Sequence, residues 1–213
     1  MQRSVNNSLV QYIEHEILPR YEHYDAAHQR DHIDAVITRS LELAKHYDVN
    51  VDMVYAIAAY HDTGICEGRE THHLVSGRII RDDIKLRNWF TENQIETMAQ
   101  AAEDHRASST HEPRSIYGKI VAEADRLIVP ETVIRRTIQY GLDHHPDYDK
   151  EGQYLRFKEH MLEKYSDNGY LRLWLPESDN APRLEELRTI IRDEARMRQT
   201  FDKEFDRLID SKQ

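Results

Sequence analysis

Residues 52–64 read DMVYAIAAYHDTG and include the most apolar stretch of the chain. The apolar run over positions 53–60 is far shorter than the roughly 20 residues that a membrane-spanning helix needs. Apolar side chains on nearly every side of a helix are typical of one buried inside a protein. Asp52 fits the N-cap of such a helix, and Gly64 fits its terminator. The sequence therefore predicts a buried central helix that begins at Asp52 and ends near His61.

Helical periodicity continues on both sides of this stretch. Apolar residues recur every three or four positions, which places them on one face of a helix. The further predicted helices span about Leu9–Leu18, Asp31–His46, His73–Ile84, Thr91–Asp104, Ser115–Ile128, Pro130–Leu142, a segment with Glu159–Lys164, and Pro182–Leu208. A loop is expected over Asp167–Asn180. The chain has only 7 Gly and 6 Pro, which argues against a turn-rich β architecture. The predicted fold class is all-α.

No internal repeat, low-complexity tract or linker divides the 213 residues. A chain of this length buries about 70% of the surface that it would expose when unfolded, so a packed core is within reach. Charged residues make up 32% of the chain and alternate with apolar ones at helical spacing, which indicates solvated helix faces. We expect residues 1–213 to form a single all-helical domain.

The formal net charge is −10, from 39 acidic and 29 basic residues. Such a surface repels a nucleic-acid polymer, whereas a bound cation and a few arginines can reverse the sign locally for a small phosphorylated substrate. The single cysteine, Cys66, excludes an intrachain disulfide and fits a reducing cytoplasm. Residues 1–16 lack the continuous apolar segment of a secretory signal. We expect a soluble, cytoplasmic protein without a nucleic-acid or membrane partner, and the oligomeric state stays open.

The dipeptide His61-Asp62 stands at the end of the predicted central helix. Burying an unpaired carboxylate is costly, so Asp62 is expected to have a partner. An arginine or a helix N-terminus is the ordinary partner, and a metal ion is the alternative. His32 near the start of the preceding helix and Asp125 beside an apolar helical stripe favour the ion. An acid beside such a stripe is usually a boundary residue or an ion-pair partner, but these four side chains could meet at one cation.

Three short motifs in this order, DHI at 31–33, HDTG at 61–64 and EADRL at 123–127, resemble those of the HD-domain superfamily of metal-dependent phosphohydrolases. The resemblance covers about residues 20–130, the expected metal-binding core, and leaves about 131–213 as a C-terminal helical extension. It implies an all-helical bundle of the HD type. Mixed His and carboxylate ligands suit Mn²⁺, Fe²⁺, Co²⁺, Ni²⁺ or Zn²⁺. The implied ligands are His32, His61, Asp62 and Asp125.

The activity that the resemblance implies is hydrolysis of a phosphate ester or phosphoanhydride by attack of metal-activated water on phosphorus. Nucleotides are the commonest substrate class that it implies. Asp62 is the expected catalytic ligand, and Glu67 is a candidate base because water activation can need a carboxylate beyond the ligands. A guanidinium can bind phosphate through two hydrogen bonds. The candidate phosphate contacts are Arg106, Arg126 and Arg69.

Members of the superfamily with two metals have further histidine ligands between the His-Asp pair and the final Asp. This interval contains His72, His73 and His105. His73 opens a predicted helix and His105 closes one, so these two are expected to bind a second ion or the substrate phosphate. The ordinary alternative is that a charged imidazole is simply favoured at a helix C-terminus by the dipole. One or two ions per chain are therefore expected.

Two other functions are compatible with these residues. A pair of irons held with the help of His73 and His105 would make the chain an oxygenase, and tight nucleotide binding without turnover would make it a sensor. Hydrolysis of cyclic dinucleotides is disfavoured, because Ile65 replaces the lysine of that branch of the superfamily and its Gly-Tyr-Pro triplet is absent. The pair His144-His145 lies outside the resemblance and is expected at the surface.

Overall fold

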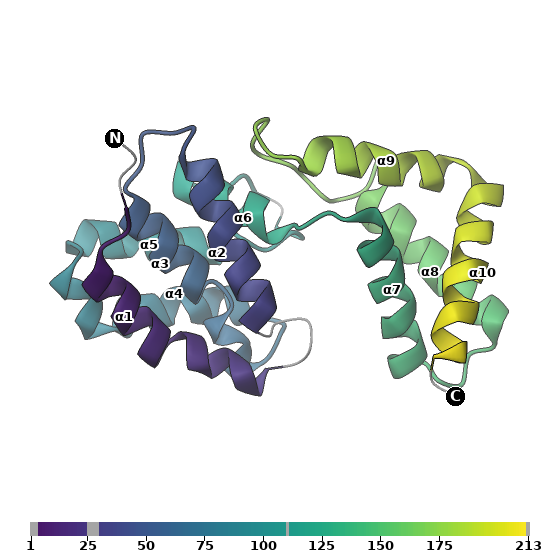
Figure 1. Cartoon of the computed structure of the whole chain (residues 1–213), viewed down its shortest axis with the longest axis horizontal. Helices are drawn as coiled ribbons and strands as arrows, with labels where there is room; N and C mark the ends of the chain where they lie inside the picture. Colours follow the sequence, from purple (N-terminus) through teal and green to yellow (C-terminus); the bar gives the residue numbers. More distant parts are fainter. Residues whose placement is uncertain (1–3, 25–29, 110, 212–213) are drawn as a thin grey trace. The chain divides into compact units, whose positions relative to one another are not determined.

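The computed structural model describes residues 4–24, 30–109 and 111–211. Over these ranges the regular elements are α-helices and short 3-10 helices, without any strand (Figure 1). The predicted all-α fold class is therefore confirmed. No helix in the described ranges has both the length and the apolar character that crossing a bilayer would require.

The chain folds into two compact units. The first comprises Met1–Leu127 together with Trp174–Ser178, and the second comprises Ile128–Leu173 and Asp179–Gln213. The chain thus leaves the first unit after Leu127, returns to it for one short segment and leaves it again. That the two units behave as a single domain around a core at about residues 20–130 stays a prediction.

The first unit is built around helix α3. Every residue of α3 from Met53 to Tyr60 is buried, as predicted for the central helix. Helix α3 packs against α1, α2, α5 and α6, while α4 packs against α5 and η2. The elements of this unit are α1 (Asn7–Glu16), η1 (Leu18–His23), α2 (Arg30–Ala44), α3 (Val51–Tyr60), η2 (Thr63–Glu67), α4 (His72–Asp82), η3 (Ile84–Asn88), α5 (Glu92–Glu103) and α6 (Ile116–Asp125).

The two ends of α3 differ from the sequence prediction. Asn50 rather than Asp52 is the N-cap, because its side-chain oxygen accepts a hydrogen bond of 2.9 Å from the backbone N–H of Asp52. Asp52 lies in the first turn, where its negative charge interacts favourably with the helix dipole. At the other end α3 stops at Tyr60, and Gly64 does not terminate it. Gly64 instead lies in η2, in close contact with the backbone of α4.

The second unit contains α7 (Pro130–His144), α8 (Lys150–Tyr165), α9 (Asn180–Arg192) and α10 (Glu194–Asp210). Helix α7 packs against the other three, and the buried rings of α8 and α10 meet in the interior. The prediction of one continuous helix over Pro182–Leu208 is wrong. Asp193 has extended backbone angles between α9 and α10, and its side chain accepts a hydrogen bond of 3.0 Å from the N–H of Arg196. This N-cap starts a new helix.

We expect Gly64→Ala to destabilise the first unit by about 1–3 kcal/mol, the usual cost of overpacking. An added Cβ would lie 2.1 Å from the carbonyl oxygen of His72 and 2.6 Å from the amide nitrogen of Ser76, so the backbones of η2 and α4 would have to separate. Thermal unfolding followed by circular dichroism measures the change. In the control Gly152→Ala, the nearest atoms to the added Cβ are side-chain atoms of Asp149 and Tyr148 at 3.3 Å, so no backbone has to move and stability should stay or rise. Equal stability of Gly64→Ala and the unaltered chain would contradict the close contact.

Candidate metal centre

Four of the predicted residues converge in the first unit. His32 lies in α2, His61 and Asp62 directly follow α3, and Asp125 is the last residue of α6. One candidate ligand atom from each side chain lies within 4.8 Å of those of the other three. The Nε2 atom of His32 is 3.2 Å from Oδ1 of Asp125, and Nε2 of His61 is 3.3 Å from Oδ2 of Asp62. Three helices thus bring together two imidazoles and two carboxylates, and metal binding by this group stays a prediction.

The ring of His61 is oriented by its own helix. Its Nδ1 is 2.7 Å from the carbonyl oxygen of Ala58, to which an Nδ1–H would donate. The buried Nε2 faces the carboxylates of Asp62 and Asp125 and has no hydrogen-bond partner in the described part of the chain. Because a nitrogen lone pair and carboxylate oxygens repel each other, a proton or a metal ion must lie between them. The group therefore fits a divalent cation, with the carbonyl of Ala58 holding the ring as backbone acceptors do for metal-binding histidines.

A second group forms on the other oxygen of Asp62. The Nε2 atoms of His72 and His105 each lie 3.3 Å from Oδ1 of Asp62, and they are 3.1 Å from each other. The Nδ1 atom of His72 is 2.7 Å from the carbonyl oxygen of Arg69, and that of His105 is 2.6 Å from the carbonyl oxygen of Ala102. With both Nδ1 protons donated to carbonyls, both Nε2 atoms are directed at Asp62. These residues fit a second cation by the same reasoning.

The side chain of Asp62 belongs to both groups. It is 3% exposed, and its two carboxylate oxygens face different histidines. Burial raises the pKa of Asp62, but the charge of His61 and the nearby imidazole of His105 outweigh burial and hold the pKa well below its usual value. The carboxylate is therefore ionised and can interact with a cation on each side.

The remaining charges of the first group are coupled to Asp62. Burial lowers the pKa of His61, but the carboxylates of Asp62 and Asp125 more than compensate and raise it well above its usual value. Burial raises the pKa of Asp125, whereas the imidazoles of His32 and His61 bring it well below its usual value. The pKa of His72 is lowered by burial and by the charge of His105. The centre thus favours ionised carboxylates.

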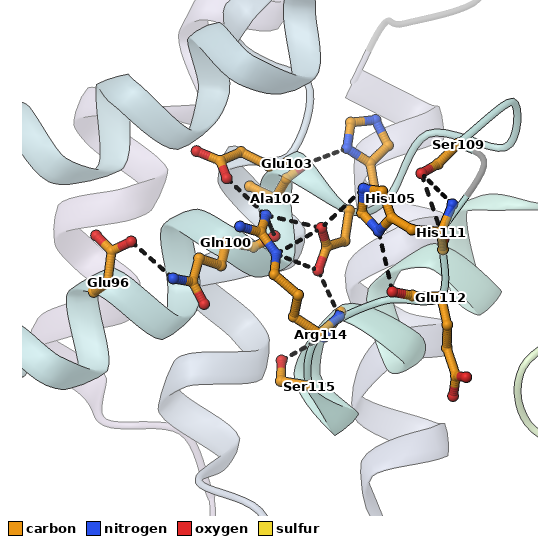
Figure 2. A network of polar contacts seen from close by, with 12 residues as sticks. Glu96, Gln100, Ala102, Glu103, His105, Ser109, His111, Glu112, Arg114 and Ser115 are labelled. Carbon is orange, nitrogen blue, oxygen red and sulfur yellow. Dashed lines mark hydrogen bonds and ion pairs between the residues drawn. The ribbon is translucent and has the colours of Figure 1, made fainter.

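The position of His105 depends on a polar network at the end of α5 (Figure 2). Asp104, directly before His105, is buried and accepts hydrogen bonds from the backbone N–H of Arg114 at 2.7 Å and from its Nε at 3.0 Å. Arg114 also donates from Nη2 to Glu103 at 2.7 Å and to the carbonyl oxygen of Gln100 at 3.0 Å. The guanidinium of Arg114 thus binds three groups around the C-terminal end of α5, and His105 follows directly after the last of them.

The structure brings His72 rather than His73 into the second group. Four positions after His72, the hydroxyl of Ser76 accepts a hydrogen bond of 2.9 Å from the N–H of Gly64. This contact turns the face of α4 that carries His72 and Ser76 toward η2 and Asp62. His73 lies on the face shared with Gly77, which approaches Glu103 of α5. The local sequence does not separate the two histidines, because a small residue follows each of them one turn along α4.

The other predicted site residues lie outside both groups. Glu67 is exposed at the end of η2, and its carboxylate forms an ion pair with Arg78. Arg69 is exposed, while Arg106 donates to the carbonyl oxygen of Glu70 at 2.6 Å. Arg126 donates to the carbonyl oxygen of Ala122, and burial lowers its pKa. The roles of Glu67, Arg69, Arg106 and Arg126 stay predictions.

Residues 30–129 match the family model of the HD domain. This match confirms the resemblance to the HD-domain superfamily that the three motifs carry. A crystal structure described as a "predicted HD superfamily hydrolase" from an uncultured Thermotogales bacterium is similar over 62% of this chain and 74% of its own, with 20% sequence identity and a TM-score of 0.49. No curated protein matches the chain in sequence.

We expect His72→Ala to remove one ion from a protein that binds two, because it takes one imidazole from the group on Oδ1 of Asp62. The neighbouring variant His73→Ala is the matched control and should keep both ions. Metal content per chain after loading with Co²⁺ and gel filtration measures the difference. If His73→Ala lost an ion while His72→Ala kept both ions, the second ion would be bound by His73 and not by His72.

Proposed function

We propose that the chain is a metal-dependent phosphohydrolase that acts on a small phosphorylated substrate, with nucleotides as the favoured class. The HD domain and its His and Asp cluster support a metal-dependent hydrolase in general. The observation that carries the proposal is the shared carboxylate of Asp62, whose two oxygens face two separate groups of histidines. Centres with two adjacent cations are common in enzymes that hydrolyse phosphate esters.

The residues of the two groups would have distinct tasks. His32, His61, Asp62 and Asp125 would hold one ion, and Asp62, His72 and His105 would hold a second. A divalent ion in such a site lowers the pKa of water and neutralises charge that develops on a phosphoryl group. Asp62 and Asp125 contribute two negative charges, so two divalent ions would leave the centre positively charged and attractive to a phosphate. Nitrogen and oxygen ligands together suit Mn²⁺, Fe²⁺, Co²⁺, Ni²⁺ or Zn²⁺.

Arginines beside the ligands would bind the substrate. Arg126 directly follows Asp125, and Arg106 directly follows His105. The backbone of each arginine therefore lies beside a candidate ligand, within reach of a substrate at the centre. Arg69 lies three residues before His72 and is a weaker candidate because it is exposed. Guanidinium groups recognise phosphate oxygens through paired hydrogen bonds. Proton acceptance by Glu67 would require its ion pair with Arg78 to open.

The same ligands would also serve two other functions. A pair of irons between the two groups would permit oxygen chemistry, for which the second histidine group is the supporting observation. A protein that binds metal and nucleotide without turnover would be a sensor. An oxygenase would be coloured when loaded with iron and would consume oxygen. A sensor would bind metal and nucleotide but release no product, so one set of assays separates both from a hydrolase.

We expect Asp62→Ala to abolish both metal binding and hydrolysis, because it removes the one ligand that the two groups share. The protein is stripped of metal, reloaded separately with Mn²⁺, Fe²⁺, Co²⁺, Ni²⁺ and Zn²⁺, and assayed with nucleoside mono-, di- and triphosphates. Phosphate and pyrophosphate are measured separately.

The control is Asp48→Ala, which removes an exposed carboxylate from the loop between α2 and α3 and should keep full activity. Full activity in Asp62→Ala would contradict the site. Bound metal without any product from the unaltered protein would favour the sensor, and oxygen consumption by an iron-loaded, coloured protein would favour the oxygenase.

A further inference from the structure

A short segment from beyond the HD match is part of the first unit. Trp174–Ser178 is reached only after the chain has formed α7 and α8, and the chain then continues into α9. Leu175 is 5% exposed and belongs to the hydrophobic core of the first unit, against which Trp174 also packs. The HD match ends at residue 129, so the segment lies outside the match. It nevertheless contributes Trp174, Leu175 and Ser178 to the packing and hydrogen bonding of the first unit.

The segment is held by the buried carboxylate of Glu123 in α6. Oε2 of Glu123 accepts a hydrogen bond of 2.7 Å from the backbone N–H of Trp174, and Oε1 accepts one of 2.6 Å from the hydroxyl of Ser178. The side chain of Glu123 is fully buried. A carboxylate in that position needs strong donors, since burial without them would be costly. Both ends of the segment supply such donors.

Glu123 lies two residues before Asp125, in the last turn of α6. Residues two apart on an α-helix project about 200° from each other, so the last turn presents Glu123 to the segment and Asp125 to the histidines. Helix α6 ends at Asp125, and Leu127 has a φ of 31°, so no further turn supports this end. The last turn of a helix lacks part of its hydrogen bonding and needs other contacts to stay fixed.

We propose that Glu123 and Ser178 are positioning residues for Asp125. Through its hydrogen bonds to Glu123, the segment Trp174–Ser178 helps to fix this candidate metal ligand. The hydrogen bonds of Glu123 fix the last turn of α6 on one side of the helix. On another side, Oδ1 of Asp125 lies 3.2 Å from Nε2 of His32. The proposal rests on the proposed function only in that the centre binds a metal ion. Residues that orient a metal ligand typically change metal affinity 10- to 100-fold when they are removed.

The test compares four variants by their affinity for Co²⁺, followed through its visible absorption, and by thermal unfolding. Ser178→Ala removes one donor to Glu123, and Glu123→Ala removes the acceptor of both bonds. Glu123→Gln keeps the shape, with an amide oxygen for the N–H of Trp174 and an amide NH₂ for the hydroxyl of Ser178. Ser166→Ala is the matched control, because its hydroxyl bonds to the carbonyl oxygen of Leu162 in the second unit.

Ser178→Ala is expected to weaken Co²⁺ binding about 10-fold and Glu123→Ala still more, with a changed Co²⁺ spectrum. Glu123→Gln should recover most of the affinity, and Ser166→Ala should match the unaltered protein. Where Glu123→Ala does not fold, the other three variants decide. Lower melting temperatures with unchanged Co²⁺ affinity and spectrum would overturn the proposal, since they would show a purely structural role. The test measures Co²⁺ binding and does not depend on hydrolysis. If the protein had no hydrolase activity, the proposed function would be disproved, but the Co²⁺ affinities would still show whether Glu123 and Ser178 position Asp125.

Discussion

The buried negative charge of Asp62 is the constraint around which the first unit is arranged. A carboxylate that is 3% exposed has lost nearly all of its hydration, and only nearby positive charge or strong donors can offset that loss. Imidazoles surround it on both sides, with His61 near Oδ2 and with His72 and His105 near Oδ1. The ends of α3, α4 and α5 therefore meet at this carboxylate. The close contact of Gly64 in η2 with the backbone of α4 keeps η2 and α4 together beside it.

Helix ends account for the orientation of the histidines. The carbonyl groups of a last helical turn lack partners within the helix. His61 follows the end of α3 and His105 follows the end of α5, and in each case Nδ1 lies within hydrogen-bonding distance of a carbonyl oxygen three residues earlier. One contact thus serves two purposes. It satisfies an unpaired carbonyl, and it commits the ring to the tautomer whose Nε2 lone pair is directed at the centre.

Features that depend on neighbouring residues could be predicted from the sequence, whereas features set by distant contacts could not. The apolar run before His61 places a polar pair at the end of a buried helix, so α3 and the convergence of His32, His61, Asp62 and Asp125 follow from short motifs. The choice between His72 and His73 depends on the rotation of α4, which the contact of Ser76 with Gly64 fixes. The anchoring of Glu123 joins residues 51 and 55 positions apart, and no local pattern announces it.

The raised pKa of His61 shows what a cation would contribute at this centre. Burial alone would favour a neutral ring, yet the carboxylates of Asp62 and Asp125 reverse this and favour a proton on His61. Without a metal ion, a proton on His61 would supply positive charge beside these two carboxylates. A divalent ion would supply more charge at the same place and would displace the proton, so metal binding and proton release are linked there. The geometry that stabilises a charged imidazole would thus also suit a metal ion, because the proton and the ion would lie between the same nitrogen and oxygen atoms.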